Sequence, residues 1–105
     1  MTSACFYTKK GRFLGFMISG HSEYSEEGSD IVCAGVSAMT SLTVTCLENS
    51  GTKFSFTSDE SKPQAVLKTE EFTQISENIL ESLYREVVSL SGEYPAYIKV
   101  EKREI

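Results

Sequence analysis

Residues 3–19, SACFYTKKGRFLGFMIS, decide the fold of this chain because they encode an apolar β-hairpin. β-Prone residues occupy 3–9 and 12–19, and Lys10-Gly11 between them favours a tight turn, since glycine tolerates a positive φ. Both alternating sets of residues in the second half are apolar. We therefore predict a central strand at 12–19 that is covered on both faces.

Two stretches further along the chain are predicted as helices. Asp30 to about Glu48 contains no proline and places apolar residues at three- and four-residue intervals. Thr69 is predicted as the N-cap of the second helix, whose apolar stripe ends at Ser91-Gly92. The first helix also has a face of small, mildly polar residues that another backbone can approach closely: Cys33, Ser37, Thr40 and Ser41.

A second hairpin and a last strand complete the order of elements. Phe54 and Phe56 alternate with polar residues, a polar turn follows at 58–62, and 63–68 supplies the returning strand. Residues 96–101 alternate as a half-buried strand. The order ββαββαβ predicts an α+β fold, a single domain over 1–105 with two helices on a largely antiparallel sheet. Periodicity leaves the order of the strands open.

Composition excludes several classes of function. The chain has 105 residues and a formal net charge of −5, and no cluster of Lys and Arg suits phosphate binding, so no direct nucleic-acid ligand is expected. Its three cysteines form no C-x-x-C pair or zinc pattern, which predicts reduced thiols in the cytoplasm, no metal and no cofactor. The longest apolar run, 31–36, is far shorter than the ~20 residues of a membrane span, which predicts a soluble protein.

The candidate catalytic residues lie where the predicted first hairpin leads into the predicted first helix. His21, the only histidine, follows Gly20, and Cys33 comes twelve residues later, after a polar segment. If Asp30 caps the helix, Cys33 lies near its start, where free N–H groups favour a thiolate over a thiol with a pKa of about 8.5. A histidine within reach would complete an activated nucleophile, and the same N–H groups are candidate donors to an oxyanion.

The residues alone leave a structural interpretation open. Cys33 can be a small packed residue and His21 an ordinary turn residue. Asp30 is most simply a helix cap, although it can also orient the imidazole or contact substrate. Ser37, one helical turn after Cys33, is an auxiliary candidate that can donate a hydrogen bond to the sulfur or the substrate.

Residues 20–40, GHSEYSEEGSDIVCAGVSAMT, resemble the ribosomal-processing cysteine protease family, called Prp. The family pattern is a Gly-His, a variable loop ending in Gly-x-Asp, an apolar pair, and Cys-Ala-x-Val-Ser. Element order and length agree over essentially the whole chain. The matching residues are Gly20-His21, Gly28, Asp30, Ile31-Val32, Cys33-Ala34 and Val36-Ser37.

The resemblance implies a cysteine endopeptidase of the bacterial cytoplasm, with His21 as general base and Cys33 as nucleophile. Such enzymes remove a short N-terminal extension from protein twenty-seven of the large ribosomal subunit, cut after an aromatic pair, and form homodimers. With one histidine and no third member evident, a Cys-His dyad is expected. The loop that orders over bound peptide is then expected to include Gly20, Ser22, Tyr24 and Gly28.

A second function class remains open from the sequence. A non-enzymatic assembly factor would bind a ribosomal protein through its acidic surface, with Cys33 merely packed. It predicts stable binding without proteolysis, whereas the peptidase predicts a cleaved product. An RNA-binding domain is disfavoured because it needs the basic patch that this chain lacks.

Overall fold

The computed structural model describes residues 1–20, 27–59 and 61–105, with side chains from residue 31 onward in the second range. It confirms the predicted order ββαββαβ and the α+β class. The elements are β1 (Thr2–Lys9), β2 (Arg12–Ser19), α1 (Glu27–Asn49), β3 (Phe54–Asp59), β4 (Gln64–Thr69), α2 (Gln74–Glu93) and β5 (Ile98–Glu104).

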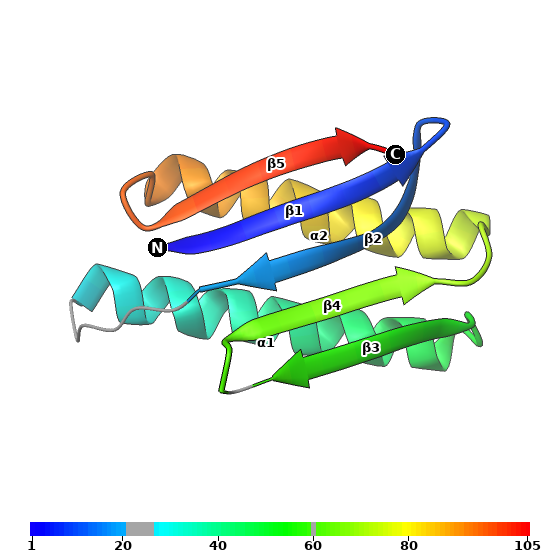
Figure 1. Cartoon of the computed structure of the whole chain (residues 1–105), viewed down its shortest axis with the longest axis horizontal. Coiled ribbons are helices and arrows are strands. Elements are labelled where there is room, and N and C mark those ends of the chain that lie inside the picture. The colour runs from blue at the N-terminus through cyan, green and yellow to red at the C-terminus, as the bar shows by residue number, and fades with distance from the viewer. Residues whose placement is uncertain (21–26, 60) are drawn as a thin grey trace.

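The five strands form one mixed sheet in the order β3-β4-β2-β1-β5, and both helices cover the same face of it (Figure 1). All neighbouring pairs are antiparallel except β1 and β5, which are parallel. β2 is central, as predicted, but the expected cover on both of its faces was wrong. On the face without helices, Cys5 and Val66 pair with Met17 from either side, so these side chains shelter one another.

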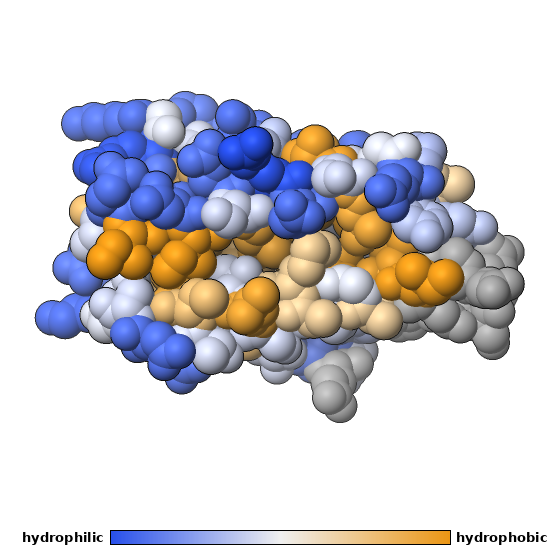
Figure 2. Space-filling model, turned by 180° about the vertical axis from the view of Figure 1, so that it is seen from behind, coloured by the Kyte–Doolittle hydropathy of each residue, from blue (hydrophilic) through white to orange (hydrophobic). Residues whose placement is uncertain are grey.

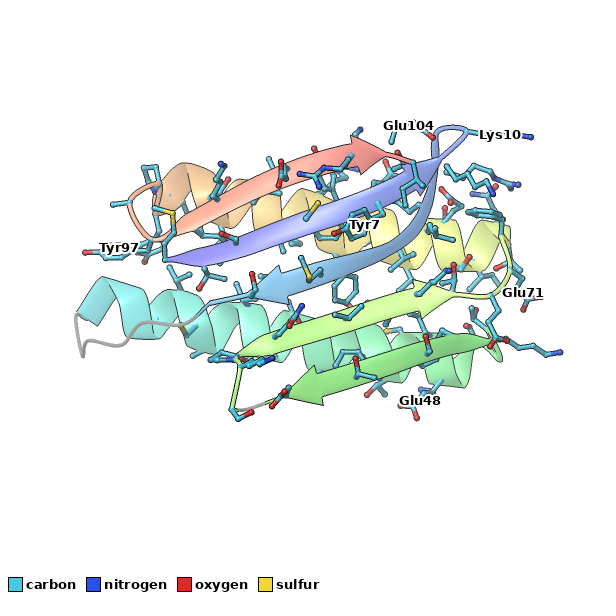
Figure 3. All side chains as sticks on the ribbon, viewed as in Figure 1. Tyr7, Lys10, Glu48, Glu71, Tyr97 and Glu104 are labelled. Atoms are coloured by element: carbon cyan, nitrogen blue, oxygen red, sulfur yellow. The ribbon has the colours of Figure 1, made fainter. Side chains whose placement is uncertain are left out.

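The turn of the first hairpin has the two left-handed residues that a type I′ turn requires. Lys10 has φ 52° and Gly11 has φ 76°, between the paired residues Lys9 and Arg12. The carboxylate of Glu104 accepts hydrogen bonds from the backbone N–H groups of Lys10 (2.6 Å) and Gly11 (3.1 Å), and Figure 3 shows Glu104 beside Lys10. The end of β5 is thereby attached to the β1–β2 turn.

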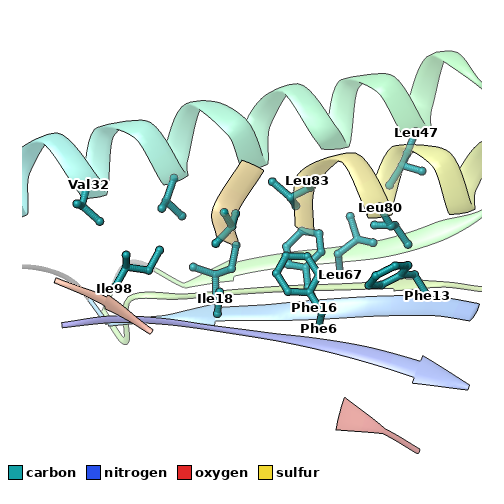
Figure 4. Close-up of a cluster of buried hydrophobic side chains, with 13 residues drawn as sticks. Phe6, Phe13, Phe16, Ile18, Val32, Leu47, Leu67, Leu80, Leu83 and Ile98 are labelled. Carbon is teal, nitrogen blue, oxygen red and sulfur yellow. The ribbon is translucent and has the colours of Figure 1, made fainter. Parts of the chain in front are cut away.

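The core lies between the sheet and the two helices (Figure 4). Phe6 contacts Phe16 and Tyr84 at ring-centroid distances of 5.7 and 5.2 Å, which joins β1 and β2 to α2. Burial of these apolar side chains is the main favourable contribution to folding. The buried members are Ala4, Phe6, Phe13, Phe16, Ile18, Val32, Val36, Leu47, Leu67, Leu80, Leu83, Val87 and Ile98.

The second helix begins later than predicted. Thr73, and not Thr69, is its N-cap: Thr73 Oγ1 accepts from the N–H of Ser76 (3.0 Å), and Ser76 Oγ accepts from the N–H of Thr73 (3.1 Å). Thr69 ends β4, and its buried hydroxyl donates to the carbonyl oxygen of Leu14 (2.9 Å). Either threonine satisfies the N-cap preference, and strand pairing at Thr69 decides between them.

The helical face exposes apolar side chains, which form a band across Figure 2. Ile31 and Leu42 on α1 are 50% and 64% exposed, and Ile75 on α2 is 54% exposed. Among the described residues, α1 from Ile31 to Asn49 is long and apolar enough to span a membrane, with a mean hydropathy of 1.5 and 28% of the window buried. A helix packed on one side of a soluble protein meets the same criterion, so the sequence expectation of no membrane contact stays a prediction.

Candidate active site

The first helix starts three residues earlier than predicted, which changes the setting of Cys33. Because α1 begins at Glu27, Asp30 lies in the first helical turn and is not the cap, and Gly28 is helical instead of part of a loop. Cys33 is consequently in the second turn. The prediction that Cys33 lies at the helix start was therefore wrong. It depended on Asp30 as the cap, and an acidic residue is favoured both as a cap and within the first turn. The free N–H groups of the helix belong to residues before Cys33.

The side chain of Cys33 is half-buried and faces the beginning of the first strand. Its Sγ lies 3.8 Å from Oγ1 of Thr2, and either atom can be the donor. A hydroxyl and a thiol from segments 31 residues apart are therefore in direct contact. This contact fixes where the sulfur lies relative to the sheet.

Cys33 forms part of the wall of a cleft of about 460 Å³. One side of the cleft is the small polar face of α1, and the opposite side comes from β3, β4 and the residues around Pro63. The cleft separates this helix face from the β3–β4 hairpin, so the predicted close approach of another backbone is not realised by that hairpin. The α1 residues in the wall include all four that the sequence singled out: Cys33, Ser37, Thr40 and Ser41.

Gly20 brings the end of β2 to the same cleft. Its φ is 87°, and its N–H donates to the carbonyl oxygen of Pro63 (2.9 Å). A Cβ at this position would lie 2.3 Å from the carbonyl oxygen of Met1, so no residue with a side chain fits without movement of the backbone. The chain therefore leaves β2 beside Met1 and continues directly into His21.

A negatively charged residue contributes to the lining of the cleft. The carboxylate of Asp59 accepts hydrogen bonds from the hydroxyl (2.7 Å) and N–H (2.9 Å) of Ser61 and from the N–H of Lys62 (3.4 Å). These hydrogen bonds lower the pKa of Asp59, and the bond from the Ser61 hydroxyl contributes most. Asp59 is thus ionised at neutral pH and already satisfied by its own turn, which makes it part of the wall and not a base.

The structure brings some of the predicted site residues together and leaves others undescribed. The cleft is lined by three of them: Gly20, Cys33 and Ser37. The predicted general base and part of the predicted loop lie outside the described residues: His21, Ser22 and Tyr24. For Asp30 only the helical backbone is described.

Other lining residues were missed by sequence reasoning. Nothing in the sequence marks Thr2 as a residue of the site, because threonine is common in the strands of any sheet. Phe56 alternates with polar neighbours and was interpreted as core; it is partly buried and packs against the core, but it also lines the cleft, which the sequence did not indicate. Its position opposite α1 follows from the strand order, which periodicity does not provide.

The remaining cysteines lie away from this cleft. Cys5 is buried in the sheet, and Cys46 lines a second, smaller groove of about 220 Å³ between α1 and α2. Among the residues that the structure describes, no group of three His, Cys, Asp or Glu side chains is placed to hold a metal ion. Cys33 is the thiol that borders both a cleft and the segment leading to His21.

A half-exposed cysteine in a cleft wall, beside the chain segment that enters the only histidine, is typical of a thiol hydrolase. A family model described as cysteine protease Prp matches residues 1–99, and the chain belongs to this family. The protein is therefore a cysteine protease. A search of curated proteins finds no match.

Solved structures share the fold over nearly the full length. SMU.848 from Streptococcus mutans is 23% identical with a TM-score of 0.89, covering 100% of this chain and 96% of its own. The ribosomal processing protease Prp from S. aureus, in complex with a covalently linked product peptide, is 20% identical with a TM-score of 0.87, covering 97% and 99%. The same protease in complex with a substrate peptide is 18% identical with a TM-score of 0.85 and the same coverage.

Proposed function

We propose that this protease removes an N-terminal extension from a large-subunit ribosomal protein of the protein-twenty-seven type, using Cys33 and His21 as a dyad. The observation that carries the proposal is that Cys33 and Gly20, the residue before His21, line one cleft. The S. aureus relative is described as a ribosomal processing protease and was solved with a substrate peptide. This relationship supports the same class of substrate here.

In the proposed reaction, His21 accepts the proton of Cys33, and the thiolate Sγ attacks the carbonyl carbon of the scissile peptide bond. The C–N bond breaks as the imidazolium gives its proton to the leaving amine, which leaves an acyl thioester on Cys33. Water then attacks the thioester with His21 as base, the C–S bond breaks, and the thiol is restored. The dyad needs no third residue to balance these proton transfers.

The cleft suits an extended peptide with aromatic side chains. Ile18, Val36 and Phe56 contribute apolar surface to its lining, and a disordered tail can occupy such a groove without unfolding its parent domain. The net charge of −5 favours encounter with a basic ribosomal protein at low salt. These properties support cleavage after an aromatic pair, as the family resemblance implies.

The proposal includes a homodimer located in the cytoplasm, as the resemblance also implies. Reduced thiols support the compartment, and the exposed apolar side chains of the helical face are compatible with association. Light scattering coupled to gel filtration measures the mass in solution. A mass near 11.6 kDa at all concentrations would rule out the dimer.

The test is incubation of an N-terminally extended ribosomal protein with wild type, Cys33→Ala and His21→Ala, followed by mass spectrometry. Wild type is expected to release the extension, and both variants are expected to leave it attached. Cys46→Ala is the matched control, because Cys46 is a second partly buried thiol on α1 that borders the other groove. Cleavage retained by Cys33→Ala would end the dyad mechanism, and stable binding without cleavage by wild type would favour the assembly factor.

A further inference from the structure

Thr2 is held rigidly at the edge of the cleft. It is the first residue of β1, its N–H donates to the carbonyl oxygen of Tyr97 (2.9 Å), and it pairs with Ile98 in the parallel register. Figure 3 places Tyr97 at this end of the sheet. On the other side the backbone approaches Gly20 closely. Thr2 is 4% exposed, so its side chain has little freedom to move.

The hydroxyl of Thr2 has the sulfur of Cys33 as a hydrogen-bond partner. Buried hydroxyl groups in proteins are normally hydrogen-bonded, and Thr2 Oγ1 lies 3.8 Å from Cys33 Sγ, within range of a bond to sulfur. Over the described ranges 1–20, 27–59 and 61–105, this is the side-chain bond that the hydroxyl makes. A rigidly held hydroxyl thus contacts the sulfur of the proposed nucleophile from outside its own helix, and toward a thiolate, which carries no proton, this hydroxyl can only be the donor.

The position of Cys33 in the second turn makes this contact more important. A helix terminus stabilises a negative charge within the first turn, and the effect falls off beyond it. Cys33 lies one turn further along α1, so the helix terminus contributes less to stabilising a thiolate, and a donor at the sulfur adds to what the proposed His21 imidazolium supplies. A hydroxyl that donates to an ionised group is a stronger partner than one that donates to a neutral group.

We propose that Thr2 is a positioning residue for the cysteine protease reaction, and that its hydroxyl donates to Cys33 Sγ and holds the thiolate toward the cleft. This inference rests on the proposed role of Cys33 as nucleophile. Thr2 itself does not touch the substrate in this scheme. When the acyl thioester forms, the sulfur becomes neutral and the bond weakens, and it returns when the thiolate is regenerated.

The hydroxyl and the methyl group of Thr2 can be tested separately. Thr2→Val keeps the shape and removes the hydroxyl, whereas Thr2→Ser keeps the hydroxyl and removes the methyl group. The readout is the rate of alkylation of Cys33 by iodoacetamide, followed by peptide mass spectrometry between pH 5 and 10. Alkylation reports the thiolate directly, and a purely structural role would not move its pH profile.

The expected result is that Thr2→Val moves the midpoint of the Cys33 profile upward by about one pH unit, as loss of a hydrogen bond to a charged group predicts. Thr2→Ser is expected to restore the wild-type midpoint, and kcat/KM on the extended ribosomal protein should fall at least tenfold for Thr2→Val at neutral pH. Should Thr2→Val fail to fold, Thr2→Ala against Thr2→Ser makes the same comparison.

Thr8→Val is the matched control. Thr8 lies on the same strand, is 5% exposed, and donates its hydroxyl to Glu104 (3.1 Å) at the opposite end of β1. It is expected to change thermal stability and leave the Cys33 profile unmoved. A Thr2→Val profile that superimposes on wild type, while wild type cleaves through Cys33, would overturn the role of Thr2 alone. Cleavage retained by Cys33→Ala would instead overturn the proposed function.

Discussion

The close approach of Gly20 to Met1 leads to a quantitative prediction for Gly20→Ala. The left-handed φ of 87° costs a residue with a side chain roughly 1–2 kcal/mol. The new Cβ would lie 2.3 Å from Met1 O, whereas real contacts essentially never fall below 3.0 Å, so the two backbones must separate by about 0.7 Å. Such a forced shift adds roughly 1–3 kcal/mol. We expect a total loss of about 2–5 kcal/mol.

Gly11→Ala separates the two contributions. Gly11 has a similar φ of 76°, but an added Cβ meets nothing within 4 Å, so only the backbone cost of roughly 1–2 kcal/mol applies. At about 4–8 °C per kcal/mol for a domain of this size, Gly11→Ala should lower Tm by roughly 5–15 °C, and Gly20→Ala by at least 5 °C more. Circular dichroism at 222 nm follows both transitions.

The same pair of variants connects stability to the site. Below the Tm of both variants, Gly20→Ala should also lower kcat/KM, because the shift moves Thr2 and the chain entering His21, whereas Gly11 lies at the far end of the hairpin. Equal Tm values for Gly20→Ala and Gly11→Ala would refute the argument, since they would mean that Met1 does not constrain residue 20.

Two further predictions concern pH and have opposite signs. Hydrogen bonds from Gly11, Thr8 and Lys10 hold the pKa of Glu104 below its usual value, so the stability it contributes is present above the unfolded pKa of about 4.3 and is lost as pH falls. The Tm of Glu104→Gln should therefore lie below that of wild type at pH 7 and converge with it in acid. Burial raises the pKa of Glu77, whose Oε1 has no partner within the described residues, so its ionised form is disfavoured in the fold. Glu77→Gln should raise Tm at pH 7, with the gain vanishing below pH ~4; a constant gain across pH would exclude burial of the charge as its cause.

Most elements could be predicted from the sequence because their periodicities are local. The hairpin at 2–19, the apolar stripe of α2 and the alternation in β5 each appear within a short window. Helix starts were less accurate, since Asp30 and Thr69 satisfy the same local preferences as true caps. The parallel pairing of β1 with β5 joins residues 96 positions apart, such as Thr2 and Ile98, and no local pattern specifies it.

The residues of the candidate site also fall into those that a local pattern predicts and those that depend on long-range contacts. The small polar face of α1 around Cys33 and Ser37 was predictable, because it belongs to one helix. Thr2 and Phe56 were not, because they reach the cleft through the strand order of the sheet. Residues that act through long-range contacts become visible only when the fold is known.

The nearness of Met1 to Gly20 affects how the protein should be handled in the laboratory. A purification tag joined ahead of Met1 would emerge at the mouth of the cleft, next to Thr2 and Cys33, and could itself occupy the groove as a pseudo-substrate. Ile105 lies at the opposite end of β1, where its N–H donates to the carbonyl oxygen of Thr8 (2.7 Å), and Figure 1 shows the two ends apart. Kinetic work should therefore use a tag placed after Ile105, or one removed completely from the front of the chain.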